Sequence, residues 1–203
     1  MIVEGIFSEI DSAKVKHWEE VCNPYAPCFI QDVSEFAHWL AFLDSRKAVA
    51  TVGPYLEIGC ASGFTLRFVK QALPDFQFVA IDDGQHFQSD QLRAWLQTKP
   101  DRVNVHFGDS HSEGSAQWLS EHGNVLSYGF VDGDHSTEGV LQDLALVMQH
   151  LSPTGFLACH DAMDKNVQKA FAEVTEAKEL ASVGFVYQDA CVPHMGIRVF
   201  QKV

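Results

Sequence analysis

The chain has 203 residues and a formal net charge of −13, with 27 acidic against 14 basic side chains. Apolar residues make up 46%, which is ordinary for a globular protein that folds around its own core. The acidic balance disfavours nucleic acid as a partner, because nucleic-acid binding depends on lysine and arginine contacts to phosphate. We expect no membrane partner, because no segment approaches the roughly 18 consecutive apolar residues of a spanning helix.

The N-terminal segment and the cysteines indicate the cellular compartment. The first residues contain no basic stretch followed by an apolar run, so we expect no signal peptide. The five cysteines are odd in number and form no C-x-x-C pair, which argues against a disulfide framework and against a zinc–thiolate site. Free thiols are typical of a reducing compartment, and we therefore expect a cytoplasmic protein.

Residues 1–50 are predicted to form a helical N-terminal appendage or substrate cap. Residues 1–31 are irregular and contain prolines at positions 24 and 27. Asp32 and Glu35 have the spacing of a capping box, which predicts that a helix begins here. One apolar face of this helix is marked by Phe36, Trp39, Leu40 and Leu43.

Residues 51–203 alternate between short apolar runs and amphipathic segments. The runs predict strands at 55–59, 76–82, 103–107, 126–131 and 155–159. The amphipathic segments predict helices near 63–72, 92–96, 112–122, 140–151 and 167–174. Two final runs, 181–187 and 196–202, have no helix between them and predict an antiparallel pair.

This alternation indicates an α/β fold. We expect a doubly wound, mostly parallel, seven-stranded Rossmann-like sheet with helices on both faces and a terminal antiparallel strand pair. Ligands bind such sheets beyond the carboxyl ends of the strands, where the strand order reverses. The residues that directly follow the strands are therefore the candidates for function, and acidic residues recur among them.

The segment YLEIGCASG at residues 55–63 contains a glycine turn with the pattern E-x-G-x-x-x-G, formed by Glu57, Gly59 and Gly63. The dinucleotide fingerprint G-x-G-x-x-G does not fit, because its later glycines fall on Ala61 and Phe64. This mismatch disfavours a nicotinamide dehydrogenase. A phosphate-binding P-loop is excluded because its lysine motif is missing.

The glycine pattern resembles the first motif of the class I S-adenosylmethionine-dependent methyltransferases. The resemblance implies that the glycine loop wraps the amino-acid part of S-adenosylmethionine. It also implies that Asp82 binds the ribose hydroxyls and that Asp109 lies beside the adenine. A carboxylate suits both tasks because it accepts hydrogen bonds from hydroxyls and amines. The implied cofactor-binding residues are Glu57, Gly59, Gly63, Asp82, Asp109 and Asp132.

The segments FVDGDHSTEGVLQDL at 130–144 and CHDAMD at 159–164 resemble small-molecule O-methyltransferases, including the macrolide-sugar enzymes. The resemblance implies His135 as catalytic base, and Asp132, His160 and Asp161 as ligands of a divalent cation. The metal-dependent members carry a carboxylate at the position of His160. Because Mg²⁺ prefers oxygen ligands, the imidazole favours Mn²⁺, Fe²⁺, Ni²⁺ or Zn²⁺ over Mg²⁺, or a site without metal. Asp134 is expected to cap the helix that follows it.

The expected activity is methyl transfer from S-adenosylmethionine to a small-molecule acceptor, most simply at a hydroxyl oxygen. His135 would remove the hydroxyl proton, or a cation would lower its pKa. One alternative is a non-haem iron oxygenase that uses His135, His160 and either Asp132 or Asp161. Another is a non-catalytic binder of a nucleotide or of S-adenosylmethionine. The walls of the pocket are expected to come from residues 1–50, 84–90 and 188–195. The sequence does not decide whether the protein forms a homo-oligomer.

Overall fold

The computed structural model describes residues 10–28, 32–47, 53–177, 179–187 and 195–202. Within these ranges the strands form one seven-stranded sheet with the order β3-β2-β1-β4-β5-β7-β6. The strands are β1 (Tyr55–Ile58), β2 (Phe78–Asp82), β3 (Val103–Phe107), β4 (Leu126–Val131), β5 (Leu151–Cys159), β6 (Leu180–Tyr187) and β7 (Ile197–Lys202).

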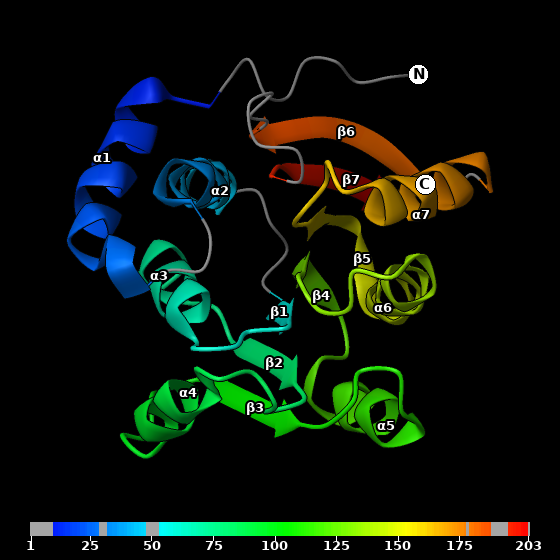
Figure 1. Cartoon of the computed structure of the whole chain (residues 1–203), viewed down its shortest axis with the longest axis horizontal. Helices are drawn as coiled ribbons and strands as arrows, with labels where there is room; N and C mark the ends of the chain where they lie inside the picture. Colours follow the sequence, from blue (N-terminus) through cyan, green and yellow to red (C-terminus); the bar gives the residue numbers. More distant parts are fainter. Residues whose placement is uncertain (1–9, 29–31, 48–52, 178, 188–194, 203) are drawn as a thin grey trace.

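Helices cover both faces of the sheet (Figure 1). They are α1 (Ser12–Cys22), the short 3-10 helix η2 (Asn23–Cys28), α2 (Val33–Arg46), α3 (Phe64–Ala72), α4 (Ser89–Leu96), α5 (Glu113–His122), α6 (Thr137–His150) and α7 (Lys165–Glu176). Helices α2, α3 and α4 lie on one face, and α1 lies outside α2. Helices α5, α6 and α7 lie on the other face, over a second hydrophobic cluster.

The predicted α/β architecture is confirmed. Strands β1 to β5 are mutually parallel where they pair, whereas β7 is antiparallel to both β5 and β6. The chain winds from β1 through β2 to β3 and then returns to place β4 on the other side of β1. The strand order therefore reverses between β1 and β4, and ligands of doubly wound sheets bind at such a point.

Several element bounds differ from those predicted. Strand β2 begins at Phe78, two residues later than expected. Leu151 was predicted as the last position of a helical stripe. In the structure it is both the C-cap of α6 and the first residue of β5. The early part of β5 pairs with β4 across a register irregularity between Leu126 and Tyr128, and this irregular pairing obscures the two-residue period in the sequence.

The N-terminal region contains one helix that the sequence did not predict. Helix α1 lies within residues 1–31 and begins after Asp11, whose side chain accepts the Ala13 N–H. Asp32 caps α2 as predicted. Glu35 does not complete the capping box, because its carboxylate is buried and faces other residues. The predicted domain boundary at residues 50 and 51 lies outside the described residues and stays a prediction.

Helix α2 shares its hydrophobic core with the sheet. Its fully buried side chains include Phe36, Trp39, Leu40 and Leu43, and they belong to the same cluster as Tyr55, Phe78 and Phe130 of the strands. Cys22, Cys60 and Cys159 are buried free thiols. Among the described residues, no helix combines the length and apolar character needed to cross a membrane.

Candidate functional site

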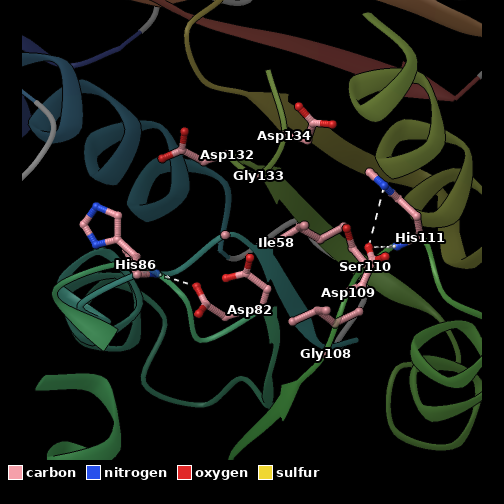
Figure 2. A pocket seen from close by; sticks show the side chains of 14 residues that line it. Ile58, Asp82, His86, Gly108, Asp109, Ser110, His111, Asp132, Gly133 and Asp134 are labelled. Carbon is pink, nitrogen blue, oxygen red and sulfur yellow. Dashed lines mark hydrogen bonds and ion pairs between the residues drawn. The ribbon is translucent and has the colours of Figure 1, made fainter. Parts of the chain in front are cut away.

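A cavity of about 570 Å³ lies at the carboxyl ends of β1, β2, β3 and β4, around the point where the strand order reverses. This volume lies within the range of small-molecule sites. Figure 2 shows acidic side chains from several strand ends arranged around it. Its lining includes Gly59, Asp82, His86, Asp109, His111 and Asp132.

The glycine loop approaches the opposite wall so closely that side chains are excluded. Gly59 has φ 80°, and a Cβ atom there would lie 2.1 Å from the carbonyl oxygen of Asp132. Gly63 has φ 73° and forms the N-cap of α3. Both positions therefore require glycine, for conformation and, at Gly59, for space. Gly59 lines the cavity, whereas Gly63 lies behind the loop against Leu92.

Asp82 stands at the end of β2 and organises the loops on either side. Its Oδ2 accepts the Ala61 N–H at 2.7 Å, and its Oδ1 accepts the Gly84 N–H at 2.8 Å. The side chain is only 6% exposed, yet it lines the cavity. Each carboxylate oxygen retains lone-pair capacity for another donor, so the predicted ribose contact remains chemically open.

Glu57 lies beneath the glycine loop rather than in the cavity wall. Its carboxylate accepts hydrogen bonds from the Thr65 hydroxyl and, at 3.2 Å, from the Tyr55 hydroxyl. Burial raises the pKa of Glu57 to about 8, although these hydrogen bonds oppose the shift. The arrangement links β1 to the first turn of α3. The predicted cofactor contact of Glu57 stays a prediction, and the geometry favours support of the loop.

The predicted catalytic and metal residues gather beyond β4 and β5. His135 Nε2 lies 3.4 Å from Asp132 Oδ1, and His135 Nδ1 lies 3.3 Å from Asp161 Oδ2. Hydrogen bonding to Asp132 raises the pKa of His135. Asp161 has φ 49°, a conformation that non-glycine residues rarely adopt and that recurs at functional sites. Two strands thus bring together residues far apart in sequence.

His160 lies deeper in this cluster and faces carboxylates on both sides. Its Nδ1 lies 3.1 Å from Asp132 Oδ1, and its Nε2 lies 3.1 Å from Glu35 Oε2. Burial alone would lower the pKa of His160, but Asp132, Asp161 and Glu35 together raise it well above its ordinary value. In return, His160 and His135 hold the pKa of Asp132 well below its usual range despite burial.

One set of donor atoms in the cluster suits a cation. Side-chain donor atoms of Asp132, His135 and Asp161 all lie within 4.8 Å of one another. His160, which the resemblance implies as a ligand, is not part of this set; its Nδ1 lies beside Asp132 and its Nε2 beside Glu35. Two carboxylates with one imidazole also differ from the two imidazoles and one carboxylate typical of non-haem iron oxygenases.

Two buried acids near the site, Glu35 and Asp143, were not predicted as site residues from the sequence. Each lies on a helix face that is otherwise apolar, with buried neighbours such as Trp39 on α2 and Val147 on α6. An acid within an apolar helical stripe is the signal that could have identified them.

The predicted helix cap near the site lies two residues before the observed one. Ser136, not Asp134, is the N-cap of α6, because its hydroxyl accepts the Gly139 N–H. Asp134 instead accepts from the N–H and the hydroxyl of Ser136, which orders the turn before the helix.

The structure describes part of the segments that were predicted to form the pocket walls. His86, from the predicted 84–90 loop, lines the cavity. Residues 188–194 lie outside the described residues.

Solved structures share this fold at low sequence identity. The O-methyltransferase TomG from Streptomyces achromogenes, solved with S-adenosylmethionine, has a TM-score of 0.67 and 12% identity over 95% of this chain and 91% of its own. An O-methyltransferase from Bacillus cereus, solved with S-adenosylhomocysteine, has a TM-score of 0.65 and 15% identity over 95% and 92%. MycE of the mycinamycin pathway, solved with Mg and S-adenosylhomocysteine, has a TM-score of 0.64 and 16% identity over 91% and 54%.

No curated protein matches the sequence. A family model described as a methyltransferase domain matches residues 56–162, from β1 to the turn after β5. This range includes the glycine loop, the acids after β2 and β3, and the cluster around Asp132. Because the match covers more than half of the chain, and the fold agrees with it, the protein belongs to this methyltransferase domain family.

Proposed function

We propose that the protein transfers the methyl group of S-adenosylmethionine to a hydroxyl oxygen of a small molecule. The observation that carries the proposal is the convergence of Gly59, Asp82, Asp109 and Asp132 on one cavity at the switch point of the sheet. The solved relatives TomG and the Bacillus cereus enzyme are O-methyltransferases bound to S-adenosylmethionine and its demethylated product, which supports the same ligand here.

The chain's own residues account for binding and orientation. Asp82 would accept the ribose hydroxyls, and the close approach of Gly59 to Asp132 would leave backbone groups facing the amino-acid part. The sulfonium supplies an already activated methyl group, so the protein has to align the acceptor and exclude water. The acidic lining is compatible with a cationic donor.

His135 is the proposed general base. It is the more accessible of the two clustered histidines, with 47% of its side chain exposed against 9% for His160. Asp132 and Asp161 flank its two ring nitrogens and orient the ring. In its neutral form, with one ring nitrogen turned from its carboxylate to the substrate, the imidazole can take the proton of an acceptor hydroxyl during methyl transfer while the other nitrogen donates to the second carboxylate.

A divalent cation is a second candidate for activating the acceptor, favoured by the grouping of Asp132, His135 and Asp161. MycE, which shares the fold, was solved with Mg. The residues fit such an ion, because two carboxylates offset its charge and the imidazole adds a nitrogen ligand. A bound cation would lower the pKa of the acceptor hydroxyl, and His135 would then serve as a ligand rather than as the base.

Calorimetry with purified protein tests the cofactor assignment. We expect S-adenosylmethionine and S-adenosylhomocysteine to bind with dissociation constants in the micromolar range, about −8 kcal/mol. NAD serves as the control ligand, and it should not bind. Binding of NAD with no binding of either sulfur nucleoside would refute the proposal.

Methyl transfer from radiolabelled S-adenosylmethionine to a panel of hydroxylated small molecules tests the mechanism. If a cation takes part, EDTA abolishes transfer and Mn²⁺ or Fe²⁺ restores it better than Mg²⁺. If His135 acts as base without metal, EDTA has no effect. His135→Ala then removes most of the transfer while S-adenosylhomocysteine still binds. Full transfer by His135→Ala in the presence of EDTA would exclude both roles.

A further inference from the structure

Asp143 is a fully buried acid on a helix face that is otherwise apolar. It lies on α6 among Val140, Leu144 and Val147, which belong to the hydrophobic cluster on that face of the sheet. A carboxylate in such surroundings is costly unless polar or charged partners compensate for its lost hydration. The proposed chemistry at Asp132 and His135 does not use Asp143, so its place in the core needs another explanation.

The partners of Asp143 come from the loop between β3 and α5. His111 Nε2 lies 3.2 Å from Asp143 Oδ1, and Ser110 precedes His111 in the same loop. Burial raises the pKa of Asp143 to about 6, against the opposing effects of Ser110 and His111. Both partners line the cavity. The buried acid therefore holds the cavity wall from behind.

His111 in turn contacts Asp109, the acid that follows β3. The backbone N–H of His111 donates to Asp109 Oδ1 at 2.9 Å, whereas the ring Nδ1 lies 3.7 Å from the same oxygen, beyond hydrogen-bond distance. The Asp109 side chain is 71% exposed and lines the cavity. Figure 2 shows Asp109, Ser110 and His111 together on one side of the cavity, across from His86. The imidazole thus lies between a buried carboxylate and an exposed one.

Asp143 also contacts a second cavity wall. A Cβ atom added at Gly133 would lie 2.9 Å from Asp143 Oδ2, so the carboxylate packs directly under the turn after β4. Gly133 lines the cavity beside Asp132. A single buried side chain therefore joins the β3–α5 loop to the β4–α6 turn and sets their relative positions.

We infer that Asp143 and His111 are positioning residues that hold Asp109 as the acceptor for the exocyclic amine of adenine, and that they thereby select adenine over hypoxanthine. The inference rests on the proposed binding of S-adenosylmethionine. A carboxylate accepts a hydrogen bond from the adenine amine but faces a second acceptor in the carbonyl oxygen of hypoxanthine. Sites built around such polar pairing reject a mismatched analogue strongly, provided that the acceptor is held in place.

The test compares the binding of S-adenosylhomocysteine and S-inosylhomocysteine by calorimetry. We expect the unaltered protein to prefer the adenine ligand by about 10–100-fold, the range of one charge-assisted hydrogen bond. Asp143→Asn and His111→Gln should each reduce this preference to less than about threefold, because the β3–α5 loop that carries Asp109 loses its anchor on α6. Asp109→Asn should reduce it as well, since an amide can also donate to the carbonyl.

Glu138→Gln is the matched control, because it removes a charge from an exposed position of the same helix. It should leave the preference unchanged. His111→Gln lies at the cavity surface and keeps the test open if Asp143→Asn does not fold. Equal weakening of both ligands, with the preference retained in both variants, would mean that the two residues only support the fold and would overturn the inference. Failure of the unaltered protein to bind S-adenosylhomocysteine would overturn the proposed function as well.

Discussion

Asp82 and Asp83 are adjacent acids that the structure places in different surroundings. Asp82 is buried and accepts two backbone N–H groups, whereas Asp83 is exposed and accepts the Gln85 N–H at 2.9 Å. We expect Asp82→Ala to weaken binding of S-adenosylhomocysteine by about 10–100-fold, because a charge-assisted acceptor is lost and the glycine loop loses its anchor. Asp83→Ala should change the dissociation constant by less than about threefold. Calorimetry measures both dissociation constants. Equal effects of the two substitutions would refute the assignment of Asp82, rather than Asp83, to the cofactor site.

Glu35 connects three distant parts of the chain. One carboxylate oxygen accepts the Gly196 N–H at 2.7 Å, and the other lies 3.1 Å from His160 Nε2. We expect Glu35→Ala to lower the free energy of unfolding by about 3–5 kcal/mol, because it leaves buried polar partners without their acceptor. Glu35→Gln should cost less, since its amide oxygen can still accept the Gly196 N–H.

Urea denaturation measures the effect of Glu35, and Glu20→Ala is the control, an acid lost from an exposed position of α1. The control should stay within about 0.5 kcal/mol of the unaltered protein. Similar small losses for Glu35→Ala and Glu20→Ala would show that the buried contacts contribute little.

At the scale of elements, α2 is part of the domain core. Trp39 is fully buried, with its ring centroid 5.4 Å from that of Phe42 and 5.5 Å from that of Phe130 in β4. We expect Trp39→Ala to lower the free energy of unfolding by about 3–5 kcal/mol, because a large cavity opens against the sheet. The measurement is urea denaturation followed by circular dichroism.

Phe87→Ala provides the aromatic control for α2, since Phe87 is 82% exposed. This variant should change stability by no more than about 0.5 kcal/mol. If α2 were a detachable cap, Trp39→Ala would behave like Phe87→Ala in the main unfolding transition, and the assignment of α2 to the core would be wrong.

At the scale of the whole molecule, Glu57 makes stability depend on pH. Its pKa rises from 4.5 to about 8 on folding because the side chain is buried. Between these values the folded state holds more protons than the unfolded state, so the contribution of Glu57 to stability falls as pH rises. Glu57→Gln removes this titration. Relative to the unaltered protein, the free energy of unfolding of the variant should therefore rise by about 2–4 kcal/mol as the pH increases from about 5 to about 8.

Urea denaturation of both proteins across this pH range isolates the effect, because every other titrating group is common to the two. A difference in stability that stays constant with pH would show that Glu57 is ionised in both states. A change in the opposite direction below about pH 4.5 would mean that the Thr65 and Tyr55 hydrogen bonds outweigh the burial.

The sequence by itself determined the order of the elements from β1 to β7, the glycine turn and the acids at the strand ends. These features depend on local rules, because apolar periodicity marks strands and helices, and parallel strands present their carboxyl ends at one edge. Helix α1 escaped prediction because only Trp18 and Cys22 are buried in it, so its apolar stripe is too sparse to show a period.

Only the tertiary structure decided which side chains meet. Glu35 reaches His160 across 125 positions, and Asp143 meets His111 from a different element. In the sequence, each acid appears as an interruption of an apolar helix face, and the neighbouring residues do not indicate which side chain it contacts. The partner follows from which face of the sheet each helix covers and how deeply it packs. The same packing turns His160 towards Glu35 and Asp132, so its surroundings were set by contacts that no spacing could reveal.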